Sequence, residues 1–438
     1  LEPALAALQV LLAAGRQAPA AGLRPQARAL AEQTQAEAAT EAEHRAAGLL
    51  WFALGVTALG RWQLPEARQA LRHADRQLGA GGLGSFRARA RAWRALAEAW
   101  QGNLGTALRC ADEARKLAGP GAQAALQAAR LAALAYSHVS LARDDLVTAQ
   151  RLAEEVTADR AGQLPGEPPV TVLAGLARAR VLLADGDATA ARAALARLRE
   201  DAGAGDPLVS DVIAVTEAEA ALRGGDAGRA RALLLVADGS GQPGAEAVRA
   251  RAGLAQGWLL LSDGDFAGAL AAVRPWLDHG GRATLPERIS ALLAAAVATR
   301  RLGDSPTAAA LLERALALGE PERAYRPFLD GGPAVRATMT VLIQPTSRHA
   351  WFAGRILERF DAQGPRPAGP EHGDSVRLTA SELAVLCFLP SHMTNEEISQ
   401  ALFLSVNTVK THLRSAYRKL GVSRRREAIA RGRRLGVL

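Results

Sequence analysis

The sequence predicts an all-α protein, a superhelix of two-helix repeats followed by a small four-helix domain. One short motif recurs at a regular interval over most of the chain. Aromatic residues are only 4% of the 438 residues, whereas 49% are hydrophobic. The core must therefore consist of Ala, Leu and Val, which suits closely packed helices. The last sixty or so residues add helix caps and an apolar stripe at helical spacing.

The recurring motif is Gly-(Asp/Asn)-x-x-x-Ala, and its spacing defines the repeat. It begins at Gly102, Gly186, Gly225, Gly264 and Gly303, with a degenerate copy at Asp144-Asp145. Ala27 and Ala67 extend the series backwards, and successive Ala positions differ by 40, 40, 42, 42, 39, 39 and 39 residues. This period, with a Gly-Asp turn inside each unit, is typical of a two-helix solenoid repeat.

The chemistry of each residue in the motif explains the unit. A helix such as Arg87–Gln101 ends at a Gly that can adopt a positive φ. The Asn or Asp then caps the next helix, and the Ala allows close packing. We expect the tryptophans of the array to pack between helices and not to form ligand cages, since no convergent polar groups accompany them in the sequence. These are Trp51, Trp62, Trp93, Trp100, Trp258 and Trp276.

The pattern divides the chain into four parts. Residues 1–330 form the helical-repeat superhelix, and residues 331–360 hold two closing helices, roughly Pro333–Ile343 and Ser347–Phe360. Residues 361–376 are rich in Pro and Gly and are expected to be a semi-stiff linker. Residues 377–438 form the terminal domain, whose helices are expected at 379–389, 394–403, 405–420 and about 425–435. Residues 162–169 look like a loop between repeats.

The third helix of the terminal domain is amphipathic. Val409, Leu413, Ala416 and Leu420 form one apolar stripe, and a second face carries polar residues that can donate hydrogen bonds. Thr394 with Glu397, and Thr379 with Glu382, have capping-box spacing. Residues 410–438 contain ten Lys or Arg and a single acid, so the whole net charge of +9 lies beside this helix. Such concentration is the electrostatic mark of nucleic-acid binding.

These residues resemble the LuxR/FixJ-type helix-turn-helix of bacterial transcription regulators. The matching words are Leu-Thr-x-x-Glu at 378–382, Thr-Asn-x-Glu-Ile at 394–398, Leu-Ser-Val-Asn-Thr-Val-Lys-Thr-His-Leu at 404–413 and Tyr-Arg-Lys-Leu-Gly-Val at 417–422. Two positions depart from the family. His392 stands where the family has Gly, and Arg424 where it has a Ser or Asn cap, so that Ser423 is an alternative start for the last helix.

The repeats, and the segment Leu318–Gly331, resemble the tetratricopeptide-like superhelix of MalT-like regulators. In that family a nucleotide-hydrolysing domain often precedes the repeats. This sequence has no Gly-x-x-x-x-Gly-Lys-(Ser/Thr) loop and opens without Met. Either that domain has been lost, or the chain is the C-terminal piece of a longer protein.

Other chemistry finds little support in the sequence. The eight His and the isolated Cys110 and Cys387 have no metal-ligand spacing, and no nucleophile stands beside a base. Acids alternate with Arg at helical spacing, as on solvated faces. No apolar run is long enough to span a membrane, and no signal peptide opens the chain. We therefore expect that the protein is not an enzyme, binds no cofactor or metal, does not associate with membranes, and is located in the reducing cytoplasm.

The resemblance implies the roles of the site residues. Base-contacting candidates are Lys410, Thr411 and Arg414. Phosphate-contacting candidates are Thr394, Ser405, Asn407, Thr408, Arg418, Lys419 and Arg425. His412 is expected to be structural or a phosphate contact. The family commonly binds DNA as a homodimer.

We interpret the chain as a sequence-specific transcription regulator that binds double-stranded promoter DNA, with activation favoured over repression. Its superhelix would sense a small molecule or dock a partner, and the regulator would act on the transcription machinery. Two alternatives stay open. One is a helical-repeat scaffold whose terminal helices only cap the array. The other is the effector half of a larger, signal-driven NTPase regulator.

Overall fold

The structure is a computed structural model that describes residues 23–118, 123–157, 170–202, 207–238, 246–277, 283–344, 346–362, 385–386, 388–389, 393–401, 406–420, 422 and 424–434. Its described residues form helices and turns, as the all-α prediction requires. They fall into two compact units, Leu1–Leu357 and Glu358–Leu438.

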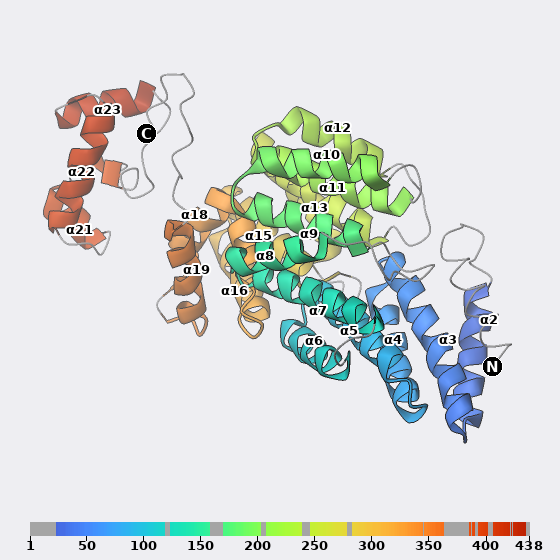
Figure 1. Ribbon diagram of the computed structural model, residues 1–438. Helices are drawn as coiled ribbons and strands as arrows, with labels where there is room; N and C mark the ends of the chain where they lie inside the picture. The colour runs from blue at the N-terminus through green and yellow to red at the C-terminus, as the bar shows by residue number, and fades with distance from the viewer. Residues whose placement is uncertain are drawn as a thin grey trace. The chain divides into compact units, whose positions relative to one another are not determined.

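The first unit is a stack of helix pairs that runs in chain order from α2 to α16 (Figure 1). The first helices of successive pairs pack on one another and form one layer. The second helices cover that layer. The first helices are α3 (Glu41–Gly60), α5 (Gly84–Gln101), α7 (Gln123–Ala142), α9 (Val170–Ala184), α11 (Pro207–Arg223), α13 (Glu246–Asp263) and α15 (Leu285–Arg301). The second helices are α2 (Leu23–Glu37), α4 (Leu64–Ala80), α6 (Leu104–Ala118), α8 (Leu146–Thr157), α10 (Ala188–Ala202), α12 (Ala227–Asp238), α14 (Phe266–Val273) and α16 (Ser305–Gly319).

The repeat motif behaves as its chemistry requires. Every alanine of the series lies on a second helix, and from Ala67 to Ala308 each is fully buried. The five motif glycines all have a positive φ, and Asp144 takes the same conformation at 66°. In the turn at Gly186, the Asp187 amide donates to the Leu182 carbonyl at 3.0 Å, which closes a Schellman motif.

The caps follow the prediction with one exception. The side chains of Asp145, Asp187, Asp226, Asp265 and Asp304 each accept the amide three residues on. At Asn103 the side chain instead donates through Nδ2 to the buried Glu98 carboxylate at 2.7 Å. Glu98 also pairs with Arg68 at 2.7 Å. The prediction that acids and arginines lie on solvated faces is therefore wrong for this cluster.

The array is closed by a short segment and two more helices. These are α17 (Arg326–Asp330), α18 (Gly332–Leu342) and α19 (Ala350–Ala362). Earlier in the chain, the short 3-10 helix η2 (Arg274–Trp276) directly follows α14. The helix α19 continues through Asp361 and Ala362, two residues into the expected linker. The remainder of that linker and the loop at 162–169 lie outside the described residues.

Residues far apart in sequence meet in the first unit. The Glu322 carboxylate accepts the Gly105 amide at 2.9 Å, and the turn at Gly102 contacts Leu285 at the start of α15. The stack therefore bends until its early turns contact residues about two hundred positions later in the chain.

Two glycines allow a matched test of that contact. Gly102 and Gly303 both have a φ of 95°. A Cβ at Gly102 would lie 2.3 Å from Leu285 Cβ, whereas a Cβ at Gly303 meets nothing within 4 Å. We expect Gly303→Ala to cost about 1 kcal/mol through backbone conformation alone. Gly102→Ala should cost about 1–3 kcal/mol more because of overpacking. Urea unfolding of the two variants measures the difference in their free energies of unfolding. Equal losses of stability would show that Leu285 does not pack against the turn at Gly102.

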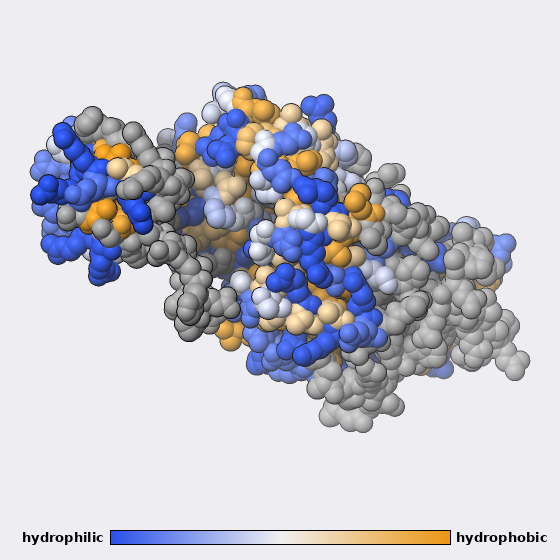
Figure 2. All heavy atoms as spheres, turned by 90° about the horizontal axis from the view of Figure 1, so that it is seen from above, coloured by the Kyte–Doolittle hydropathy of each residue, from blue (hydrophilic) through white to orange (hydrophobic). Residues whose placement is uncertain are grey.

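The surface of the array is mixed, with hydrophilic side chains among scattered apolar ones (Figure 2). Within the described part of the chain, no helix is long and apolar enough to cross a membrane.

Candidate nucleic-acid interface

The second unit holds α21 (Asn395–Ala401), α22 (Val406–Leu420) and α23 (Arg425–Arg434) around a small apolar core. The four stripe residues of α22 are buried in that core, as predicted, together with Ile398 of α21 and Ala428 of α23. Val385, Leu386 and Leu389 also pack there. These three residues belong to the helix expected at 379–389, of which the structure describes 385–386 and 388–389. The Thr379–Glu382 capping box lies outside the described residues.

The start of α21 is fixed by the expected capping box. The Thr394 amide donates to the Glu397 carboxylate at 2.7 Å, and the Glu397 amide donates to Thr394 Oγ1 at 3.3 Å. The hydrogen bonds from the Thr394 amide and hydroxyl lower the pKa of Glu397. The stability that this carboxylate contributes is therefore present above the ordinary pKa of Glu and is lost as pH falls through the lowered value.

The exposed face of α22 carries the candidate DNA contacts. Lys410, Thr411 and Arg414 are exposed, as are Asn407 and Arg418. At 100° per residue these five positions fall within an arc of about 100°, roughly opposite the buried stripe. Three positive charges thus lie along one side of a helix whose other side is fixed to the core. A helix of this shape fits the major groove of DNA.

The other candidate residues have varied surroundings. Thr394 is exposed, and His412 is partly buried. Ser405 lies outside the described residues, as do the side chains of Thr408 and Lys419. The Arg425 guanidinium donates to the Leu389 carbonyl at 2.9 Å and 3.3 Å. Sequence reasoning missed this bond, because nothing in the pattern relates the start of α23 to position 389.

The last helix begins at Arg425, as predicted, and not one residue earlier with Ser423 as the cap. The Arg424 carbonyl accepts the Ala428 amide at 3.0 Å, and the Arg424 amide donates to Glu427 at 3.2 Å. Arg424 therefore stands at the cap, and Glu427 replaces a side-chain cap by reaching back to its amide.

A second place where polar groups converge is a pocket in the first unit. It is lined by Trp62, Trp100, His138, Arg180, Thr216 and Arg251, together with aliphatic side chains of α9 and α11. The prediction that the array tryptophans only pack between helices is confirmed for Trp51 and Trp93, which are buried. Trp62 and Trp100 also pack against core residues, but they are only partly buried and have polar neighbours from helices that the sequence could not place beside them.

His138 in this pocket gives a pH-dependent prediction. Burial, helped by Arg180, lowers the pKa of His138 to about 3. The unfolded chain binds a proton below pH ~6.5 that the folded chain excludes. The free energy of unfolding should fall as pH drops from there towards 3, by up to about 1.4 kcal/mol per pH unit from this group. His138→Gln should show a shallower loss when urea unfolding is measured at pH 7 and pH 5, and an unchanged slope would contradict the assignment.

The fold and the exposed basic helix define a helix-turn-helix DNA-binding protein with a helical-repeat array. A family model of the MalT-like TPR region matches residues 6–343. The model of bacterial regulatory proteins of the luxR family matches residues 376–431. The chain therefore belongs to the MalT-like TPR family and carries a domain of the luxR family of bacterial regulatory proteins.

Two transcriptional regulators are similar to this chain over short stretches. The transcriptional regulatory protein LiaR of Bacillus subtilis is 38% identical over 76 residues, 17% of this chain and 34% of that protein. The HTH-type transcriptional regulator MalT of Yersinia pestis is 39% identical over 69 residues, 16% of this chain and 8% of that protein. The matches thus span about a third or less of these relatives.

Proposed function

We propose that the protein binds promoter DNA in a sequence-specific manner through α22, and that its superhelix senses an effector. The observation that carries this proposal is the exposed face of α22 opposite its buried stripe. Lys410 and Arg414 can donate to guanine N7 and O6, and the Thr411 methyl can meet a thymine methyl. Asn407, Arg418 and Thr394 would contact phosphates, together with Ser405, Thr408 and Lys419.

Arg425 remains a candidate phosphate contact, but it has a structural task as well. Its bond to the Leu389 carbonyl anchors the start of α23 to the core. We therefore expect Arg425→Ala to weaken the packing of α23 in addition to any loss of DNA affinity.

The wider proposal covers the partners of the regulator. A homodimer on a two-fold site, activation through the transcription machinery, and a cytoplasmic location with no enzymatic activity all follow from the family resemblance. A scaffold that used the terminal helices as a cap would not need three cations on the exposed face of α22, and this observation favours the regulator.

The test is selection of DNA sequences by the full chain. Random duplexes captured over several rounds should enrich one motif, and affinity for it should fall with salt by a log–log slope of about −0.9 per phosphate neutralised. A two-fold symmetric motif would support the homodimer. Binding without an enriched motif, or without salt dependence, would overturn the proposal in favour of the scaffold.

A further inference from the structure

The pocket described above lies in the layer of first helices. Its residues come from the α3–α4 turn and from α5, α7, α9, α11 and α13, so it spans several successive repeats. The space between its walls, including the part open to solvent, is about 300 Å³. Only about 20 Å³ of it is enclosed, the room of about one water, so a ligand would bury little more than a carboxylate here and would lay its body along the open walls.

Arg180 is the charged group in this pocket without a direct ion-pair partner among the described side chains. Among the side chains that the structure describes, none forms an ion pair or hydrogen bond with its guanidinium, although it is mostly buried. Arg251, in contrast, contacts both oxygens of Glu219 at 2.9 Å and 3.0 Å. Burial, followed by the repulsion of Arg251, lowers the pKa of Arg180. Glu219 and Asp330 act on Arg180 from a distance and offset part of this effect, but neither bonds to its guanidinium.

The uncharged polar groups that line the pocket do not bond to Arg180 either. His138 Nε2 accepts the Trp100 indole N–H at 3.0 Å, so the ring is held neutral by its geometry. The Thr216 hydroxyl donates to the Val212 carbonyl at 2.8 Å. All five donors of Arg180 stay available, and a planar guanidinium matches the two oxygens of a carboxylate.

The apolar wall of the pocket is built at a conformational cost. Trp62 stacks on Trp100 with ring centroids 4.7 Å apart. It stands at the turn position that Gly102, Gly186 and the later motif glycines occupy, and it has a φ of 56°. The next residue, Gln63, makes no side-chain cap, whereas the corresponding aspartates do. The first turn of the series thus departs from the repeat pattern at both positions, and such departures often mark functional sites.

We propose that this pocket binds a small carboxylate with an apolar body, the carboxylate on Arg180 and the body against Trp62, Trp100 and the aliphatic side chains of α9 and α11. The ligand supplies the directly bonded partner that Arg180 lacks and covers the exposed parts of the indole rings. This inference deepens the proposed function, because such a ligand would be the effector that the superhelix senses.

The test is isothermal titration of the full chain without DNA. The probes are phenylacetate, 4-phenylbutyrate and hexanoate, each beside its primary amide. We expect at least one carboxylate to bind with a Kd on the order of 0.1–1 mM and its amide to bind at least about tenfold more weakly. Arg180→Gln should raise the Kd about tenfold or more. Arg178→Gln, an exposed arginine on the same helix, is the matched control and should leave the Kd unchanged.

The outcomes separate the pocket from the proposed function. If none of the carboxylates binds, if the amides bind equally well, or if Arg180→Gln and Arg178→Gln behave alike, the pocket assignment is overturned. Circular dichroism of both variants checks that the array still folds. Carboxylate binding that leaves DNA affinity unchanged would support the pocket and overturn the sensing role alone.

Discussion

The double variant Lys410→Ala/Arg414→Ala is expected to lose the preference for its selected DNA motif over random duplex. Each side chain that contacts two acceptors of a guanine contributes about 1–3 kcal/mol of discrimination, so the two together should lower the ratio of specific to non-specific affinity by about 30-fold to 10⁴-fold. The fold should be unaffected, because both residues are exposed while the stripe of α22 stays buried. Fluorescence anisotropy with both duplexes measures the ratio.

Arg418→Ala is the matched control on the same helix face. As a proposed phosphate contact it should weaken binding to both duplexes alike and reduce the salt slope by about 1. If the double variant also weakened both duplexes equally, Lys410 and Arg414 would be phosphate contacts, and the bases would be read by other residues.

The sequence could predict those features of this protein that depend on neighbours along the chain. The buried alanines, the left-handed glycines and the aspartate caps are local, since each lies within a few residues of its partner. The stripe of α22 and the Thr394–Glu397 box are local too. Such features follow from helical periodicity and from the chemistry of single turns.

What could not be predicted depends on the curvature of the array. Trp100 and Arg180 lie on different repeats, and no pattern says which side chains of successive first helices converge. Trp62 carried a signal that could have been read, because it replaces a motif glycine. The contacts of α17 are more distant still, since they join residues 142 and 182 positions apart.

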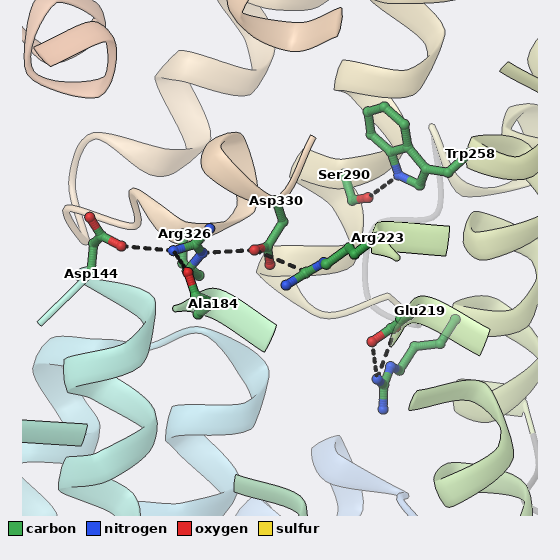
Figure 3. Close-up of polar contacts among 9 residues, drawn as sticks. Asp144, Ala184, Glu219, Arg223, Trp258, Ser290, Arg326 and Asp330 are labelled. Carbon is green, nitrogen blue, oxygen red and sulfur yellow. Dashed lines mark hydrogen bonds and ion pairs between the residues drawn. The ribbon is translucent and has the colours of Figure 1, made fainter. Parts of the chain in front are cut away.

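These contacts of α17 hold the end of the array against earlier turns, and they lead to the second large prediction. The mostly buried Arg326 donates to Asp144 at 2.9 Å, to the Ala184 carbonyl at 3.2 Å and to Asp330 at 2.7 Å (Figure 3). Asp330 also pairs with Arg223 at 3.0 Å. Burial opposes the ionisation of Asp330, but Arg223 and Arg326 outweigh it and lower its pKa.

Removing Arg326 should therefore be among the most destabilising single changes in the first unit. Arg326→Leu leaves the Asp144 and Asp330 carboxylates and the Ala184 carbonyl without this donor, and losing one partner of a buried ion pair costs about 3–5 kcal/mol. Urea unfolding followed by circular dichroism measures the loss. Arg231→Leu, which breaks the exposed pair with Asp263, is the control and should cost about 1 kcal/mol or less.

A variant at Asp144 tests the same ion pair from its other side. It has a φ of 66° at a turn position where other repeats have Gly, so its side chain is kept at a conformational cost that the Arg326 pair explains. Asp144→Gly should destabilise the wild-type chain, because Arg326 loses a carboxylate. In the Arg326→Leu background the same change should be neutral or stabilising, because it relieves the backbone and removes a carboxylate that has lost its Arg326 donor. A double-mutant cycle with no coupling between the two positions would show that Asp144 has its conformation for another reason.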